Sequence, residues 1–130
     1  MGAVIGLERQ ITHKPAGLRT HMLVSFGAAL FVLIPLLITT DQDSREAAVS
    51  RVIQGITAGV GFIGAGEILR ESQHDSKLAQ VHGLTSAAAI WVCAALGIAA
   101  GCGLWQLALT GSVMSLVVLS VFGRLEKRHF

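Results

Sequence analysis

The side chain most able to do chemistry in this sequence is Glu67, an acid near the end of the apolar run 51–69. A carboxylate in such a run is costly unless it is paired, hydrated or close to a membrane surface. Two interpretations remain open: a functional carboxylate that binds a cation or a proton, or an ion pair with Arg70, three residues further along the same helix. Gln54 and Thr57 lie in the same run, where they either line a polar path with Glu67 or form hydrogen bonds between helices.

A second group of candidate residues carries charge at the ends of apolar segments. Its members are Glu8, Arg9, Arg19 and Arg70. The carboxylates of Glu8 and Glu67 offer opposite charges to the arginines, so we expect an ionic cluster at one membrane surface. Exposed charge fixed at tightly packed helix ends can recognise a partner, and we therefore predict that this cluster is an interaction or conformational hot spot.

Other kinds of site find no support in the residue pattern. The five histidines, at 13, 21, 74, 82 and 129, show no metal-binding spacing, and Cys93 and Cys102 are nine positions apart, which predicts packed free thiols. No catalytic triad, nucleotide-binding loop or nucleophile elbow can be placed, since the glycines at 61, 64 and 66 lie inside an apolar helix. We expect neither an enzyme, nor a cofactor, nor a resident metal.

Composition indicates which solvent surrounds the elements that carry these residues. Of 130 residues, 52% are hydrophobic and 14% charged, and the net charge is only +2, with basic residues in short loops and at the ends. This usage is far more apolar than that of soluble domains, and it leaves no basic surface for nucleic acid. The protein is therefore expected to lie in a lipid bilayer.

The apolar residues fall in long blocks, as spanning helices require. The sequence predicts one all-α domain over 1–130, a multi-pass transmembrane bundle without a soluble C-terminal domain. Spans are expected at 18–38, 51–69, 84–102 and 104–122, with polar links at 39–50 and 72–82. The apolar stretch before Glu8 is too short to span, so we interpret it as the last two turns of a truncated first helix.

The positions of the basic residues predict the orientation of the bundle. Eight of the ten Lys and Arg residues lie in three regions: the initial segment, the link with Arg70 and Lys77, and the tail with Arg124, Lys127 and Arg128. Basic residues favour the cytoplasmic side of a membrane. These three regions, including the C-terminus, are therefore expected in the cytoplasm.

Small residues predict how the helices pack. Side chains of this size let helix backbones approach closely in lipid, where packing holds helices together. The glycines expected to pack are Gly55, Gly59, Gly61, Gly64, Gly66, Gly97 and Gly101. Because small residues cover two sides of the 51–69 helix, we predict that it lies in the middle of the bundle. Its bulky stripe of Ile53, Ile56, Val60 and Ile63 should then face lipid or a partner.

Four ordered motifs connect the sequence to a known family. They are GLERQ at 6–10, AGLRTHMLV at 16–24, GFIGAGEILR at 61–70 and GLTSAAAIWV at 83–92. Together they resemble the MgtC/SapB family of bacterial inner-membrane proteins. The resemblance implies a domain of about five helices and links to growth in low magnesium, acid tolerance and survival inside host cells. The sequence departs from the family pattern at Glu67, where an apolar or small residue is expected.

The resemblance also implies a function. One branch of the family resembles a regulator that binds the F-type ATP synthase, so we expect this chain to act in magnesium or acid-stress homeostasis by regulating membrane partners. A Mg²⁺ or proton transporter using Gln54, Thr57 and Glu67 is the alternative. One acidic residue per chain would then require a homo-oligomer to form a ring. A structural assembly subunit is the third interpretation.

Overall fold

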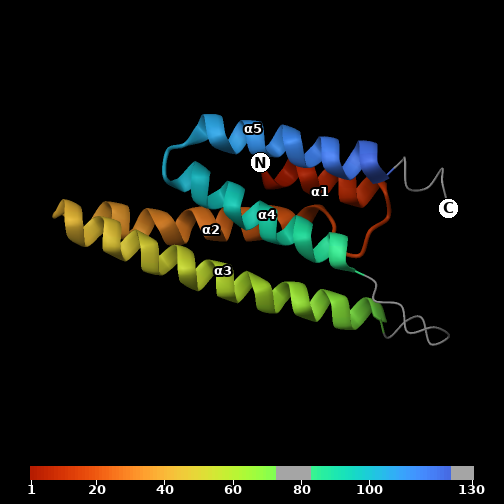
Figure 1. Ribbon diagram of the computed structural model, residues 1–130, viewed down its shortest axis with the longest axis horizontal. Coiled ribbons are helices and arrows are strands. Elements are labelled where there is room, and N and C mark those ends of the chain that lie inside the picture. The colour runs from red at the N-terminus through yellow and green to blue at the C-terminus, as the bar shows by residue number, and fades with distance from the viewer. Residues whose placement is uncertain (73–82, 124–130) are drawn as a thin grey trace.

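The computed structural model describes residues 1–72 and 83–123. Within these ranges the chain forms five α-helices, a final π-helical segment and no strand. The helices are α1 Gly2–Ile11, α2 Leu18–Ile38, α3 Gln42–Ser72, α4 Leu84–Gly101, α5 Trp105–Val117 and the π-helical η1 Val118–Phe122. The predicted all-α bundle is confirmed (Figure 1). Lys77 and the basic tail, on which the predicted orientation partly depends, lie outside the described residues.

Three of these helices, α2, α3 and α4, are long and apolar enough to cross a membrane. Their lengths of 21, 31 and 18 residues fit a hydrocarbon core that needs about 20 helical residues. The predicted bounds agree at both ends of α2 and to within one residue for α4. The last predicted span is a shorter apolar helix, Trp105–Val121, in which α5 passes directly into η1.

Helix α3 begins nine residues before its predicted start at 51, so the predicted polar link over 39–50 is wrong for most of its length. Asp41 explains the early start, because its carboxylate accepts a hydrogen bond of 2.9 Å from the backbone N–H of Ser44. The hydroxyl and the backbone N–H of Ser44 together hold the pKa of Asp41 below its ordinary value. Hydropathy did not reveal this beginning, because a polar first turn needs a cap rather than an apolar face.

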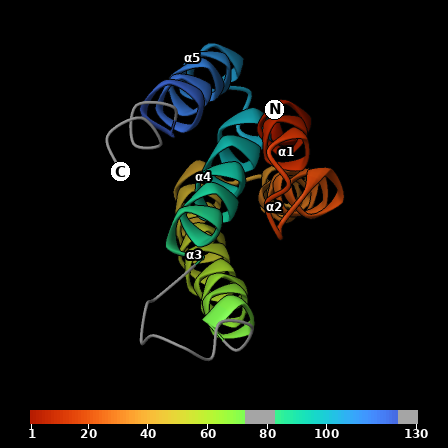
Figure 2. The ribbon, with the colours of Figure 1, turned by 90° about the vertical axis from the view of Figure 1, so that its right-hand side faces the viewer.

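The middle of the bundle is occupied by α4, which contacts each of the other four helices. Figure 2 shows α4 between α5 and α3, with α1 and α2 together on one side. Ile90 and Cys93 of α4 are almost fully buried. The prediction that the 51–69 helix lies in the middle is therefore wrong: α3 packs on one flank, against α4 and α2.

Helix α3 also presents a different face to the core from the one predicted. Ile56 and Val60 are each only 8% exposed and pack with Val32 of α2 and Ile90 of α4. The prediction that the bulky stripe faces outward is wrong for these two residues, although Ile63 is exposed. Branched side chains fill the space beside α4, and the small-residue side of α3 is left outside.

The closest approach in the bundle is between α2 and α4. A Cβ atom added at Gly97 would collide with the backbone carbonyl of Ser25, and one at Gly101 would lie 2.8 Å from the carbonyl oxygen of Ala29. At Gly64 an added Cβ would lie 3.3 Å from the Cβ of Ala87, on α4. The predicted packing role is confirmed for these three glycines.

The other predicted packing glycines have open space beside them. Around Gly55, Gly59, Gly61 and Gly66, no atom of another described segment lies within 4 Å of the place where a Cβ would stand. The prediction that they pack inside the bundle is wrong, because the core takes up the opposite side of α3. Small residues indicate that a helix can be approached closely, but not by which neighbour.

The contact at Gly97 generates a prediction for stability. Gly97→Ala should lower the free energy of unfolding by about 1–3 kcal/mol, because the added methyl forces α4 away from the α2 backbone. Gly59→Ala is the matched control, since its methyl enters open space and alanine favours helix. Unfolding of both variants in mixed micelles, followed by circular dichroism, measures the difference. Equal stability of the two variants would show that α2 and α4 do not approach as closely as described.

Candidate functional site

The candidate site lies at one end of the bundle, where α1 packs against the first half of α2. Two glycines allow this contact: an added Cβ at Gly6 would lie 2.8 Å from the Cα of Leu18, and one at Gly2 would collide with the carbonyl of His21. They stand four residues apart, so both face α2. This close seating brings the polar end of α1 into the interior.

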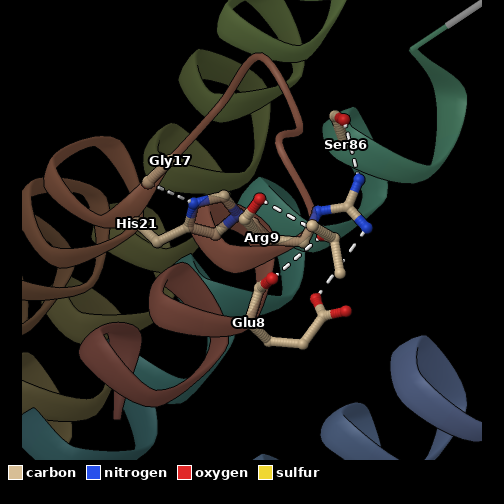
Figure 3. A network of polar contacts seen from close by, with 6 residues as sticks. Glu8, Arg9, Gly17, His21 and Ser86 are labelled. Carbon is tan, nitrogen blue, oxygen red and sulfur yellow. Dashed lines mark hydrogen bonds and ion pairs between the residues drawn. The ribbon is translucent and has the colours of Figure 1, made fainter.

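Arg9 is the central residue of the site. It is 3% exposed, and its Nη2 donates a hydrogen bond of 2.9 Å to the Oγ of Ser86, at the start of α4. Its Nη1 lies 4.0 Å from Oε2 of the neighbouring Glu8, at the limit of an ion pair. Arg9 therefore ties α1 to α4 through a buried, charge-assisted hydrogen bond (Figure 3). The prediction of exposed charge at this helix end is therefore wrong for Arg9.

His21 lies beside Arg9 and is completely buried. Its Nδ1 is 2.8 Å from the backbone carbonyl oxygen of Gly17, as Figure 3 shows. A carbonyl can only accept a hydrogen bond, so Nδ1 carries the hydrogen, and in a neutral ring Nε2 presents a lone pair. This Nε2 is enclosed and has no hydrogen-bond partner among the residues that the structure describes.

Glu67 lies on α3. It is partly buried, and its Oε1 is enclosed without a hydrogen-bond partner among the described residues. The ion pairs found among the described residues do not include Glu67 with Arg70, so the predicted pair within α3 is not formed. Arg70 is exposed, whereas the Glu67 carboxylate turns toward the bundle.

The structure divides the predicted ionic cluster into two parts. Glu8 and Arg9 come together inside the bundle. Arg19 and Arg70 are exposed at the same end of the bundle, near the start of α2 and the end of α3. Of the three arginines in the predicted cluster, Arg19 and Arg70 thus lie at the surface and Arg9 lies in the interior.

The predicted polar path is not brought together. Gln54 and Thr57 are exposed, and each forms its hydrogen bond within α3: Gln54 Nε2 donates to the Oγ of Ser50 at 3.3 Å, and Thr57 Oγ1 donates to the carbonyl of Ile53 at 2.8 Å. Helical rotation places Gln54 about 140° and Thr57 about 80° from Glu67, so the three side chains do not share one face of α3. Thr57 borders a groove of about 320 Å³ between α3, α4 and α5 whose other lining residues are apolar or Cys.

Sequence reasoning missed four residues of the site. Ser86 sits in an alanine-rich stretch, where nothing distinguishes it from a packing residue. Gly2 and Gly6 are four positions apart, and this spacing of small residues is a signal for a close helix contact that the sequence does carry. His21 lies in the motif at 16–24, but its position shows no metal-binding spacing and so predicts no role. Their common feature is a partner on another helix.

The arrangement brings together a carboxylate, a guanidinium, an imidazole and a hydroxyl from α1, α2 and α4 (Figure 3). No group of three or more His, Cys, Asp or Glu side chains converges to hold a metal ion in the part of the chain that the structure describes. Such a group can fix the helix ends to one another.

Comparisons with known proteins agree with the resemblance carried by the four motifs. A family model described as MgtC family matches residues 1–128. Protein SrpB of Synechococcus elongatus is 51% identical over 98% of this chain and 71% of its own length. The "Putative magnesium transporter YhiD" of Escherichia coli K12 is 45% identical over 95% of this chain and 56% of its own length.

A further relative, Protein MgtC of Salmonella typhimurium LT2, is 40% identical over 89% of this chain. The match takes in 45% of that relative, so this chain spans about half the length of the latter two proteins. No solved structure matches this chain.

The buried hydrogen bond of Arg9 generates a prediction. Ser86→Ala should lower the free energy of unfolding by about 1–3 kcal/mol, because a buried guanidinium N–H loses its acceptor. Thr110→Ala is the matched control, since Thr110 is exposed and donates only to carbonyls of its own helix. Unfolding curves in mixed micelles measure both changes. A loss no larger than that of the control would mean that Ser86 does not hold Arg9.

Proposed function

This chain belongs to the MgtC family, and from that premise we propose that it acts in magnesium or acid-stress homeostasis by regulating other membrane proteins. The proposal places the chain in a bacterial inner membrane, with its basic end, where Arg19 and Arg70 are exposed, in the cytoplasm. Names of relatives support the magnesium connection, since one is called a magnesium transporter. An F-type ATP synthase is the partner that the family resemblance favours.

The observation that carries a regulatory role is the open outer face of α3. This face combines exposed Gly55, Ala58, Gly59 and Ala65 with Phe62, which is 83% exposed. No atom of another described segment lies within 4 Å of an added Cβ at either glycine. Small residues on a membrane helix allow a second helix to pack closely, and Phe62 offers a large side chain for that helix to cover. We take this face as the docking surface for a transmembrane helix of the partner.

A polar group beside this face supports the assignment. Gln54 is exposed, although its position lies within a membrane-spanning helix, whereas Thr57 lies on another side of α3, beside the groove against α4 and α5. Amide groups in such helices usually form hydrogen bonds across to a neighbouring helix. A partner helix on the outer face would provide those bonds to Gln54, and the exposed Arg19 and Arg70 would add contacts to its cytoplasmic end.

Substitutions on this face test the proposal. Gly59→Leu should leave the fold intact and weaken partner binding roughly tenfold or more, because a branched side chain holds the partner helix at a distance. Gly27→Leu on α2 is the matched control, since it also enters open space. Growth in low magnesium and co-purification with the F-type ATP synthase are the two readouts. Unchanged growth and binding with Gly59→Leu would contradict the proposal.

Transport of Mg²⁺ or protons is the second candidate function, and the enclosed Glu67 carboxylate favours it. Purified protein in proteoliposomes is tested for Mg²⁺ and proton flux, alone and as Glu67→Gln. We expect no saturable flux, because Gln54 and Thr57 do not join Glu67 in a path through the chain. Saturable flux that Glu67→Gln abolishes would establish transport and overturn the regulatory proposal.

A further inference from the structure

A long apolar groove runs along α4, which Figure 2 shows between α3 and α5. Its volume is about 320 Å³. The lining residues on α4 include Ala94, Ala95 and Ala99, whereas α3 and α5 contribute larger side chains such as Ile53 and Leu107. Small side chains on the central helix thus leave a hollow between bulkier ones on both flanks.

The length and the depth of the groove match one leaflet of a bilayer. Along α4 its lining runs from Trp91 to Cys102, eleven positions that extend about 16 Å at the rise of an α-helix. One leaflet contributes about 15 Å to the hydrocarbon core. Trp105, 61% exposed, follows the turn at 102–104, and exposed tryptophans favour the interface between membrane and water. The groove therefore begins at one membrane surface and ends near the middle of the bilayer.

The size and the chemistry of the groove decide what kind of occupant fits. An α-helix is about 10 Å across, so three turns of it occupy on the order of 1,000 Å³, about three times the volume of the groove. A helix of a partner or of a second copy would therefore leave most of its volume outside. The groove offers almost no polar recognition, because the Thr57 hydroxyl donates its hydrogen to the carbonyl of Ile53 at 2.8 Å. A narrow, flexible hydrocarbon chain meets both conditions.

We propose that this groove binds one acyl chain of a phospholipid, taken from the leaflet at the 102–104 turn. The acyl chain lies along α4, with its methyl end beside Trp91 and its headgroup outside the groove. It fills the space between α3 and α5, which both pack on α4. An empty groove would forfeit the dispersion contacts of its lining atoms. The inference holds whether the protein regulates partners or transports ions.

Quenching of tryptophan fluorescence by brominated phospholipid tests the groove directly. Trp105→Phe leaves Trp91 as the only tryptophan, since the sequence has two. Trp91 lines the groove and is 50% exposed. In detergent micelles that contain little phospholipid, quenching should saturate at one lipid per chain, and bromine near the methyl end should quench more strongly than bromine near the headgroup. Quenching that rises with lipid content without saturating would overturn the proposal.

Substitutions in the Trp105→Phe background then locate the lipid. Ala95→Leu should raise the lipid concentration at half-saturation about tenfold or more, because displacing two or three methylenes from an apolar site has roughly that effect on affinity. Thr57→Leu narrows the groove from α3 and should act in the same way. Ala100→Leu is the matched control, since Ala100 is exposed on the same helix and does not line the groove.

Two results of these titrations would contradict the inference. If all three leucine variants bind the brominated lipid as their Trp105→Phe parent does, the lipid lies elsewhere on the surface. If Trp91 is shielded from the lipid in a chain that sediments as a dimer, a second copy covers the groove. Circular dichroism of each variant confirms that its helices are retained, and the saturation measured in the parent is read without any change inside the groove other than the lipid.

Discussion

The contact between α2 and α4 is the constraint on which the rest of the bundle depends. In lipid there is little hydrophobic gain from bringing two apolar helices together, so close packing must supply the attraction. Gly97 and Gly101 remove side chains from α4 where Ser25 and Ala29 of α2 approach it. With these backbones touching, α4 becomes the central helix, and α1, α3 and α5 pack around it.

Close packing also explains why charged residues are found inside the bundle. Gly2 and Gly6 seat α1 on α2, and this position directs Arg9 toward the first turn of α4. Once there, the guanidinium cannot reach water and needs buried partners, which Ser86 and Glu8 provide. The polar cluster is thus a consequence of how near the helices lie, and it links the same helices that the glycines bring together.

Small residues lie both at contacts between helices of the bundle and on its outer surface. At Gly97 and Gly64 they admit a neighbouring helix of the same chain, whereas at Gly59 and Gly66 they leave a helix face open. The open face lies on α3, whose other side carries Glu67 toward the buried cluster. One helix therefore carries both the open outer face and the partly buried Glu67.

Composition and block length by themselves determined that this protein is an all-α membrane bundle and placed α2 and α4 almost to the residue. The four motifs determined its family. Hydropathy missed the start of α3, because a capped polar turn has no apolar signature. Only the tertiary structure decided that α4 is central, that Ile56 and Val60 face inward and that Arg9 is buried. The reason is physical: a membrane helix is apolar on every side, so its sequence does not record which side meets protein and which meets lipid. The buried cluster joins residues up to 77 positions apart, and only the packing of α1, α2 and α4 brings them together.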